Sequence, residues 1–150
     1  MKKIVFILGS MNRGGAERVI SILSRDYAEK GWKVDIILLL YYKISYDLNE
    51  NVNVIDFTGN KSSRIGRIPF WIKSIREYVK KEKPDVILSF AARINVISQI
   101  STIGLAKRIF VSERNDPRCD GRSFIVDKMT KILYPRADGL VFQTHRAARY

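Results

Sequence analysis

The chain has 150 residues, 46% of them apolar and 28% charged, a composition that is typical of globular proteins and excludes collagens, coiled coils and disordered chains. Its one cysteine (Cys119) and one histidine (His145) exclude a disulfide framework, a four-thiolate metal site and a multi-histidine metal site. The formal net charge of +12 indicates an anionic partner, which can be nucleic acid, an anionic membrane surface or a phosphorylated small molecule, unless the chain is merely a basic soluble protein.

Two kinds of segment alternate along the chain: continuous apolar runs and stretches whose apolar residues recur at helical spacing. Continuous apolar runs are typical of strands that are buried on both faces of a parallel sheet. The expected elements are, in order, strand 3–8, a helix from 16 that ends at 31, strand 33–40, strand 52–57, helix 64–82, strand 85–90, helix 95–105, strand 108–112, helix 124–134, strand 139–143 and a helix that begins at 144. Pro69 is expected in or near the first turn of helix 64–82. The alternation predicts βαβ units and an α/β fold with a doubly wound, Rossmann-like parallel sheet.

The N-terminus begins like a signal peptide, with Met1-Lys2-Lys3 followed by the apolar run 4–8. That run stops at Gly9 and is shorter than the roughly 7–15 apolar residues of an export signal. No run approaches the roughly 20 apolar residues of a membrane span. We therefore expect a buried first strand and a cytoplasmic protein, with peripheral contact to the inner face of the cell membrane as a further expectation from the charge.

The loop after the first strand contains two adjacent glycines, Gly14 and Gly15, directly before a helix. In doubly wound sheets ligands bind at the carboxyl ends of the strands, and a helix N-terminus attracts phosphate through its backbone amides. The loop is not a dinucleotide fingerprint, because Met11 stands where the second glycine is required, and it is not a Walker loop, because Gly15-Ala16 replaces Lys-Ser/Thr. We expect bare amides that face a phosphate, the alternative being a tight turn without a ligand.

Four segments resemble the motifs of one family, in the same order and spacing. They are GGAERV at 14–19, KPDVILSF at 83–90, SERNDP at 112–117 and YPRADG at 134–139 with the following Gln143-Thr144. Over essentially its whole length the chain resembles the N-terminal half of the family-four retaining glycosyltransferases. The resemblance implies the GT-B architecture, in which two Rossmann-like domains face each other across a cleft. Residues 1–150 would be the acceptor-side domain, and the C-terminal nucleotide-sugar domain would be absent from this chain.

The resemblance implies transfer of a sugar from a nucleotide diphosphate-sugar to an acceptor, in cell-surface polysaccharide or lipid-linked glycan assembly, with no metal ion and no cofactor. The donor would be held mainly by the missing domain, and the acceptor would be a glycan or a polyprenyl-phosphate-linked glycan. We expect no binding of nucleic acid and no turnover by this fragment alone. Two alternatives stay open: a generic nucleotide-binding Rossmann domain, and a basic nucleic-acid-binding protein, although the chain lacks an RRM-type aromatic signature and a zinc finger.

The resemblance also assigns roles at the ends of the strands. The residues expected on the donor-phosphate side of the cleft are Gly14, Gly15, Glu17 and Arg18. Glu17 has a second interpretation, since a carboxylate in the first turn of a helix is stabilised by the helix dipole. Ser89 and Arg93 are expected at the acceptor rim, the alternative being a helix cap and a solvated charge.

The SERNDP segment supplies the catalytic candidates Glu113, Arg114 and Asp116. Many relatives place a histidine in the matching stretch. Arg114 cannot act as a base at neutral pH but can bind phosphate through two hydrogen bonds. Glu113 or Asp116 would orient the acceptor hydroxyl, unless the segment is an internally salt-bridged surface loop.

Helix 64–82 carries an apolar stripe that can cover the sheet. In a second interpretation, part of the helix meets an anionic membrane, because aromatic and basic side chains together suit a bilayer interface. The residues that would make this contact are Arg67, Phe70, Trp71 and Lys73.

Overall fold

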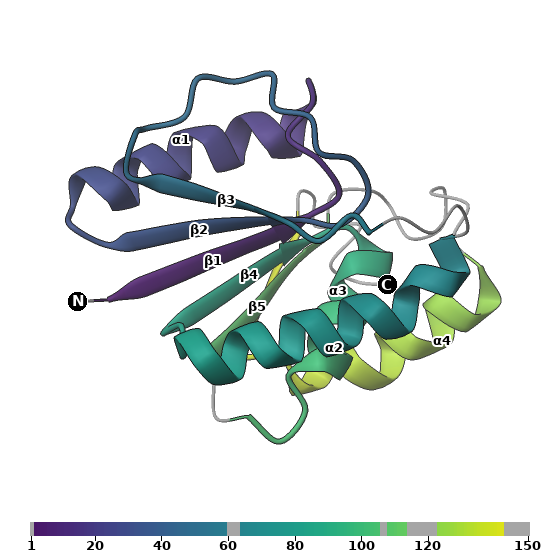
Figure 1. The fold of residues 1–150 in the computed structure, drawn as a ribbon. Helices are drawn as coiled ribbons and strands as arrows, with labels where there is room; N and C mark the ends of the chain where they lie inside the picture. Colours follow the sequence, from purple (N-terminus) through teal and green to yellow (C-terminus); the bar gives the residue numbers. More distant parts are fainter. Residues whose placement is uncertain (1, 60–63, 106–107, 114–122, 143–150) are drawn as a thin grey trace.

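The structure is a computed structural model that describes residues 2–59, 64–105, 108–113 and 123–142. Within these residues six strands form one parallel sheet in the order β3-β2-β1-β4-β5-β6 (Figure 1). The strands are β1 (Lys3–Leu8), β2 (Lys33–Leu38), β3 (Val52–Asp56), β4 (Val86–Phe90), β5 (Arg108–Glu113) and β6 (Gly139–Phe142). The helices are α1 (Gly15–Glu29), α2 (Arg64–Glu82), α3 (Ala92–Ser101) and α4 (Phe124–Leu133), and a 3₁₀ turn, η1 (Tyr134–Arg136), follows α4.

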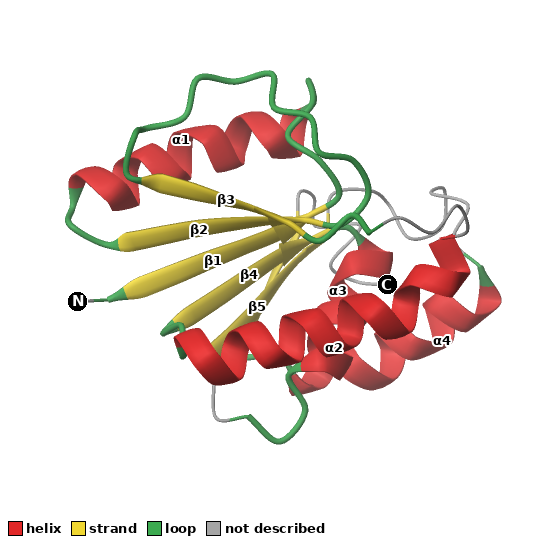
Figure 2. Ribbon diagram, viewed as in Figure 1, coloured by secondary structure: helices red, strands yellow, loops and turns green. Residues whose placement is uncertain are grey.

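The helices cover the two faces of the sheet unequally. Figures 1 and 2 show α1 on one face and α2, α3 and α4 on the other. Successive residues of β1 enter opposite cores: Phe6 belongs to the cluster on the α1 side and Ile7 to the cluster under α2 and α3, and both have no exposed surface. This burial on both faces explains the continuous apolar run of the first strand. The predicted doubly wound, Rossmann-like α/β fold is confirmed.

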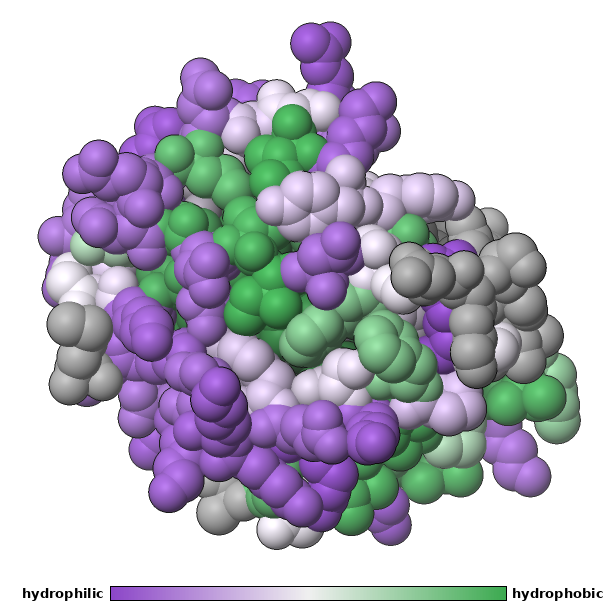
Figure 3. Space-filling view, viewed as in Figure 1, coloured by the Kyte–Doolittle hydropathy of each residue, from purple (hydrophilic) through white to green (hydrophobic). Residues whose placement is uncertain are grey.

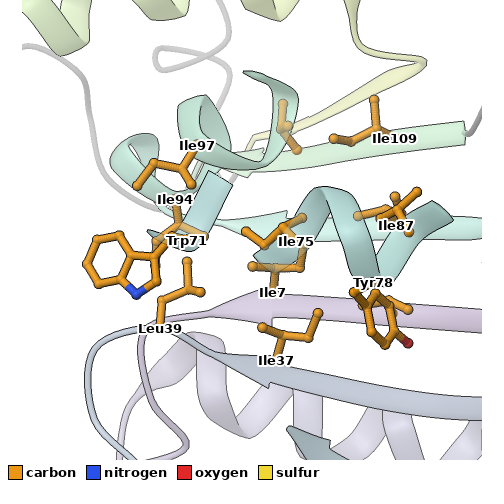
Figure 4. Close-up of a cluster of buried hydrophobic side chains, with 13 residues drawn as sticks. Ile7, Ile37, Leu39, Trp71, Ile75, Tyr78, Ile87, Ile94, Ile97 and Ile109 are labelled. Carbon is orange, nitrogen blue, oxygen red and sulfur yellow. The ribbon is translucent and has the colours of Figure 1, made fainter. Parts of the chain in front are cut away.

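The larger core lies between the sheet and helices α2 and α3. Figure 4 shows Ile7 of the sheet next to Ile75 of α2, and Leu39, directly after β2, next to Trp71 of α2. On the outside, β3 is an edge strand whose apolar side chains are only half-buried. Figure 3 shows apolar side chains in the middle of this view, over β3, between the hydrophilic surfaces of α1 and α2.

Two helices differ from the sequence-based expectation. Helix α3 begins at Ala92 instead of residue 95 and ends at Ser101, where a turn reaches Gly104 with φ of 78°. The residue before it, Ala91, has φ of 77° and lends no side-chain cap, so the start carries no capping signal in the sequence. Pro69 lies inside α2, beyond its first turn. Residues from 143 onward, including the expected last helix, lie outside the described residues.

Among the described residues, none of the helices is long and apolar enough to cross a membrane.

Candidate functional site

The order of the strands reverses between β1 and β4, and the loops that leave these two strands lie at the carboxyl edge of the sheet. In open α/β sheets this switch point is where ligands bind. The glycine loop after β1 lies on one side of it and the N-terminus of α3, after β4, on the other. The position predicted for the site is therefore where the fold places a ligand crevice.

The glycine loop is fixed by the loop that follows β2. The amide of Met11 donates to the carbonyl of Lys43 at 2.9 Å, and the amide of Ser45 donates to the carbonyl of Met11 at 2.8 Å. Ser45 Oγ also donates to Oδ1 of Asn12 at 3.0 Å. Met11 has no exposed surface and acts as the anchor of the loop. No sequence pattern predicts this pairing, because it joins segments more than thirty positions apart without a repeating motif.

Gly14 is less open than expected. Its amide donates to Oη of Tyr46 at 3.3 Å, and the same hydroxyl donates to the carbonyl of Gly14 at 3.1 Å. A Cβ added at Gly14 would meet the carboxylate of Glu17, which lies back over the start of α1. The expectation of a bare amide at Gly14 is therefore wrong, whereas Gly15 and Arg18 are exposed at the start of α1.

A hollow of about 690 Å³ opens beside the glycine loop at the ends of β1, β2 and β3. Its lining residues are Ser10, Asn12, Leu40, Tyr41, Tyr42, Lys43, Thr58, Gly59 and Arg67. Tyr41 and Tyr42 are more than half exposed. The two basic side chains, Lys43 and Arg67, line the hollow together with neutral polar residues. A hollow with aromatic walls and a few polar groups is typical of a ligand site. Apart from Arg67, these residues were not expected from the sequence.

Arg67 is held at the floor of this hollow by α2. Its Nη1 donates to the carbonyl of Thr58 at 2.9 Å, and its guanidinium lies 5.4 Å from the ring centroid of Trp71. Its Nε is buried and has no hydrogen-bond partner within the described part of the chain. Because the guanidinium of Arg67 lines the hollow, its positive charge would favour an anionic oxygen there.

A buried polar network stands at the ends of β4 and β5. Ser89 Oγ donates to Oδ1 of Asn95 at 2.7 Å, and Nδ2 of Asn95 donates to the carbonyl of Ser112 and to Oη of Tyr134, both at 3.1 Å. Tyr134 Oη donates to Oε2 of Glu113 at 2.6 Å. Ser89 has no exposed surface and Glu113 is 2% exposed. Both were expected to face the acceptor, and both expectations are wrong because the side chains are used inside the fold.

Arg93 is exposed in the first turn of α3, which fits both a rim position and a solvated charge, so its role at the acceptor rim stays a prediction. Arg114 and Asp116, the other two catalytic candidates, lie outside the described residues. No cluster of metal-ligating side chains occurs in the described ranges.

The four residues of α2 that were expected at a membrane differ in their exposure to solvent. Trp71 is 3% exposed, packs in the core and donates from Nε1 to the carbonyl of Phe57 at 2.8 Å, so the expectation of membrane contact is wrong for it. Phe70 is 43% exposed and Lys73 is exposed. The other interpretation of this helix, a stripe that covers the sheet, is confirmed by the buried Ile75.

Comparisons with known proteins agree with the motifs. The sequence profile of Glycosyltransferase Family 4 matches residues 13–150. The chain is 28% identical, over 151 aligned residues, to the GalNAc-alpha-(1->4)-GalNAc-alpha-(1->3)-diNAcBac-PP-undecaprenol alpha-1,4-N-acetyl-D-galactosaminyltransferase of Campylobacter jejuni subsp. jejuni serotype O:2. The match covers 93% of this chain and 40% of that relative, so the chain spans less than half of the relative's length.

Solved structures share the fold. Sucrose-phosphate synthase from Thermosynechococcus elongatus matches with a TM-score of 0.73 and 13% identity, over 93% of this chain and 42% of that one. UDP-N-acetylglucosamine 2-epimerase from Rickettsia bellii matches with a TM-score of 0.67 and 20% identity, over 100% of this chain and 41% of that one. Since a transferase and an epimerase both match, this likeness shows the fold alone, and the assignment comes from the sequence: the chain belongs to glycosyltransferase family 4.

Proposed function

We propose that the chain is the acceptor-side domain of a glycosyltransferase that moves a sugar from a nucleotide diphosphate-sugar to a lipid-linked glycan. The observation that carries this proposal is the hollow with Arg67 at its floor, at the ligand edge of a family 4 fold. The relative in Campylobacter jejuni, whose name describes transfer to a glycan on PP-undecaprenol, supports the choice of acceptor class. The donor is held mainly by the domain that this chain does not include.

The chemistry requires stabilisation of the leaving diphosphate, because negative charge develops there as the sugar becomes oxocarbenium-like. The N-termini of α1 and α3 both begin at the carboxyl edge, on the two sides of the switch point, and each carries partial positive charge. Arg18 and Arg93 are exposed in the first turns of these helices. The chain therefore contributes two helix ends and two guanidinium groups to a cleft.

The acceptor occupies the hollow beside the glycine loop. Tyr41 and Tyr42 offer aromatic faces to sugar rings, and Arg67 and Lys43 offer donors to the phosphates of the carrier. The same edge meets the membrane that contains the carrier, on its cytoplasmic side, through Phe70 and the positive charge of the chain.

The proposal is tested by binding of a short polyprenyl diphosphate to this chain, measured by calorimetry. Arg67→Gln should weaken binding about tenfold, because a charge-assisted hydrogen bond is lost. Arg76→Gln is the matched control: Arg76 lies on the same helix and also donates from Nη1 to main-chain carbonyls, those of Ser101 and Ile103, away from the hollow. Equal affinities in the two variants would contradict the acceptor site.

The activity itself is tested on the full-length polypeptide. It should transfer a labelled sugar from at least one of a panel of nucleoside diphosphate-sugars to a polyprenyl-diphosphate-linked glycan, whereas this chain alone should not. Transfer by the isolated chain, or none by the full-length protein, would overturn the assignment.

A further inference from the structure

We propose that Asn95 is a positioning residue for sugar transfer, which acts through the first turn of α3 and the end of β5. The proposal rests on the function proposed above and adds residues that shape the same site. Its basis is the saturated hydrogen bonding of one buried side chain, combined with an unusual backbone conformation beside it.

The side-chain carboxamide of Asn95 connects four elements: α3, β4, β5 and η1. It accepts from Ser89 at the end of β4 and donates to the carbonyl of Ser112 in β5 and to the hydroxyl of Tyr134 in η1. Asn95 itself lies in α3 and has no exposed surface. Because both donors and the acceptor oxygen are used, the side chain has one orientation, and the start of α3 is fixed to two strand ends.

The backbone beside this amide is strained. Ala91, the last residue before α3, has φ of 77° and ψ of 143°, a conformation that favours glycine. A non-glycine residue in such a region is strained and persists only where the surroundings hold it. The amide of Ala91 donates to the carbonyl of Ser112 at 3.2 Å, and Asn95 Nδ2 donates to the same carbonyl. The network thus fixes the group that holds Ala91.

The consequence lies at the switch point. If the carbonyl of Ser112 is released, Ala91 relaxes toward an ordinary conformation and the first turn of α3 rotates with it. That turn carries the exposed Arg93 at the carboxyl edge of the sheet. Since a misplacement of about 1 Å can cost about 100-fold in rate, the network should affect the chemical step more than substrate binding.

Two mild substitutions test this without opening a large cavity. Ser89→Ala removes the donor to Asn95 Oδ1, and Tyr134→Phe keeps the ring but removes the hydroxyl that accepts from Asn95 Nδ2 and donates to Glu113. Ser101→Ala is the matched control, because Ser101 is also a fully buried serine and lies in α3, and its hydroxyl donates to the carbonyl of Ile97 in the same helix. All three variants are made in the full-length protein and assayed for kcat, KM and melting temperature.

The proposal predicts that Ser89→Ala and Tyr134→Phe each lower kcat about tenfold and change KM by less than about twofold. The double variant should lose less than the product of the two single effects, because both act through one amide. Ser101→Ala should lower the melting temperature as much as Ser89→Ala while keeping kcat.

A purely structural network would lower the melting temperature of all three variants and leave kcat unchanged, and this result would overturn the proposal. An inactive wild-type protein, with every donor in the panel, would instead overturn the proposed function and this inference with it. The two failures are therefore distinguished by the wild-type measurement.

Discussion

Lys3 and Asp35 form a buried ion pair at the amino end of the sheet, with 2.8 Å between Nζ and Oδ2. Their side chains are 7% and 3% exposed. Lys3 Nζ also donates to Glu82 at 2.7 Å, and the hydroxyl of Tyr78 donates to Asp35. The cluster joins β1, β2 and α2 at the edge opposite the candidate site, so it affects stability without contact to that site.

The alkaline stability of the protein should depend on Tyr78. Burial and the hydrogen bond to Asp35 raise the pKa of its hydroxyl above the ordinary value of 10.0. The unfolded chain then loses this proton first, so the free energy of unfolding should fall as the pH rises above about 10. Tyr78→Phe should flatten this fall, as measured by urea unfolding between about pH 8 and pH 11. An equally steep fall in the variant would contradict the role of Tyr78.

Lys3 should contribute to the same alkaline fall. Burial disfavours its charged form, but the hydrogen bonds to Asp35 and Glu82 outweigh burial and raise the pKa of the ammonium above 10.5. In the Tyr78→Phe variant, the remaining decrease in the free energy of unfolding is therefore expected to begin near pH 10.5.

Acid stability should depend on Glu82. The hydrogen bond from Lys3, followed by the positive charges of Lys3 and Lys33, lowers the pKa of this carboxyl below its ordinary value of 4.5. Its stabilising effect is present above that value and is lost as the pH falls through the pKa of the folded state. Glu82→Gln should therefore show a shallower loss of stability below about pH 4.5 in urea unfolding. A variant that follows the wild-type acid limb would exclude this contribution.

The sequence predicted most of the fold because its signals were local. The apolar run of β1 reports burial on both faces, and the family motifs gave the positions of the strand ends. Trp71 was also readable: it lies three positions after Ile68 and four before Ile75, so helical spacing places it on the buried stripe, whereas Phe70 lies off it.

The site was less predictable because its contacts join distant segments. Ser89 and Glu113 stand at strand ends, where an exposed polar residue and a buried network residue look alike in sequence. Only the fold shows that Asn95 and Tyr134 reach them. The pairing of Tyr46 with Gly14 likewise has no local pattern.

Substitutions at Phe70 and Trp71 should have different effects: the one at Trp71 should lower stability, and the one at Phe70 should weaken membrane binding. Trp71→Phe should lower the free energy of unfolding by about 1–3 kcal/mol, because the part-buried carbonyl of Phe57 loses its donor. Phe70→Ser should change stability by less than about 0.5 kcal/mol but weaken sedimentation with vesicles of phosphatidylglycerol and phosphatidylcholine. Ile22→Ser is the matched control, since Ile22 is 57% exposed on α1. Equal loss of vesicle binding in both serine variants would exclude a specific contact at Phe70.

Ala91→Gly should stabilise the fold. Glycine avoids most of the strain at φ of 77°, a gain of about 1–3 kcal/mol that is offset by about 0.5–1 kcal/mol of chain entropy. Ala92→Gly, one position along in the first turn of α3, should instead destabilise by up to about 1 kcal/mol. Thermal unfolding of the two variants should therefore shift in opposite directions, and a destabilised Ala91→Gly would show that the backbone at 91 is not strained.

Tyr46→Phe should free the backbone amide of Gly14, which was expected to bind a phosphate. The hydroxyl bonds to Gly14 are exposed and long, so their loss should cost no more than about 1 kcal/mol of stability. A phosphate that binds at Gly14 must displace this hydroxyl, and its removal should tighten binding of a nucleoside diphosphate to this chain, as measured by calorimetry. Tyr27→Phe, at a partly buried tyrosine of α1 that does not line the hollow, controls for the loss of a tyrosine hydroxyl. Weaker binding in Tyr46→Phe than in the control would mean that the hydroxyl holds the loop in its binding conformation, and that phosphate does not compete for the Gly14 amide.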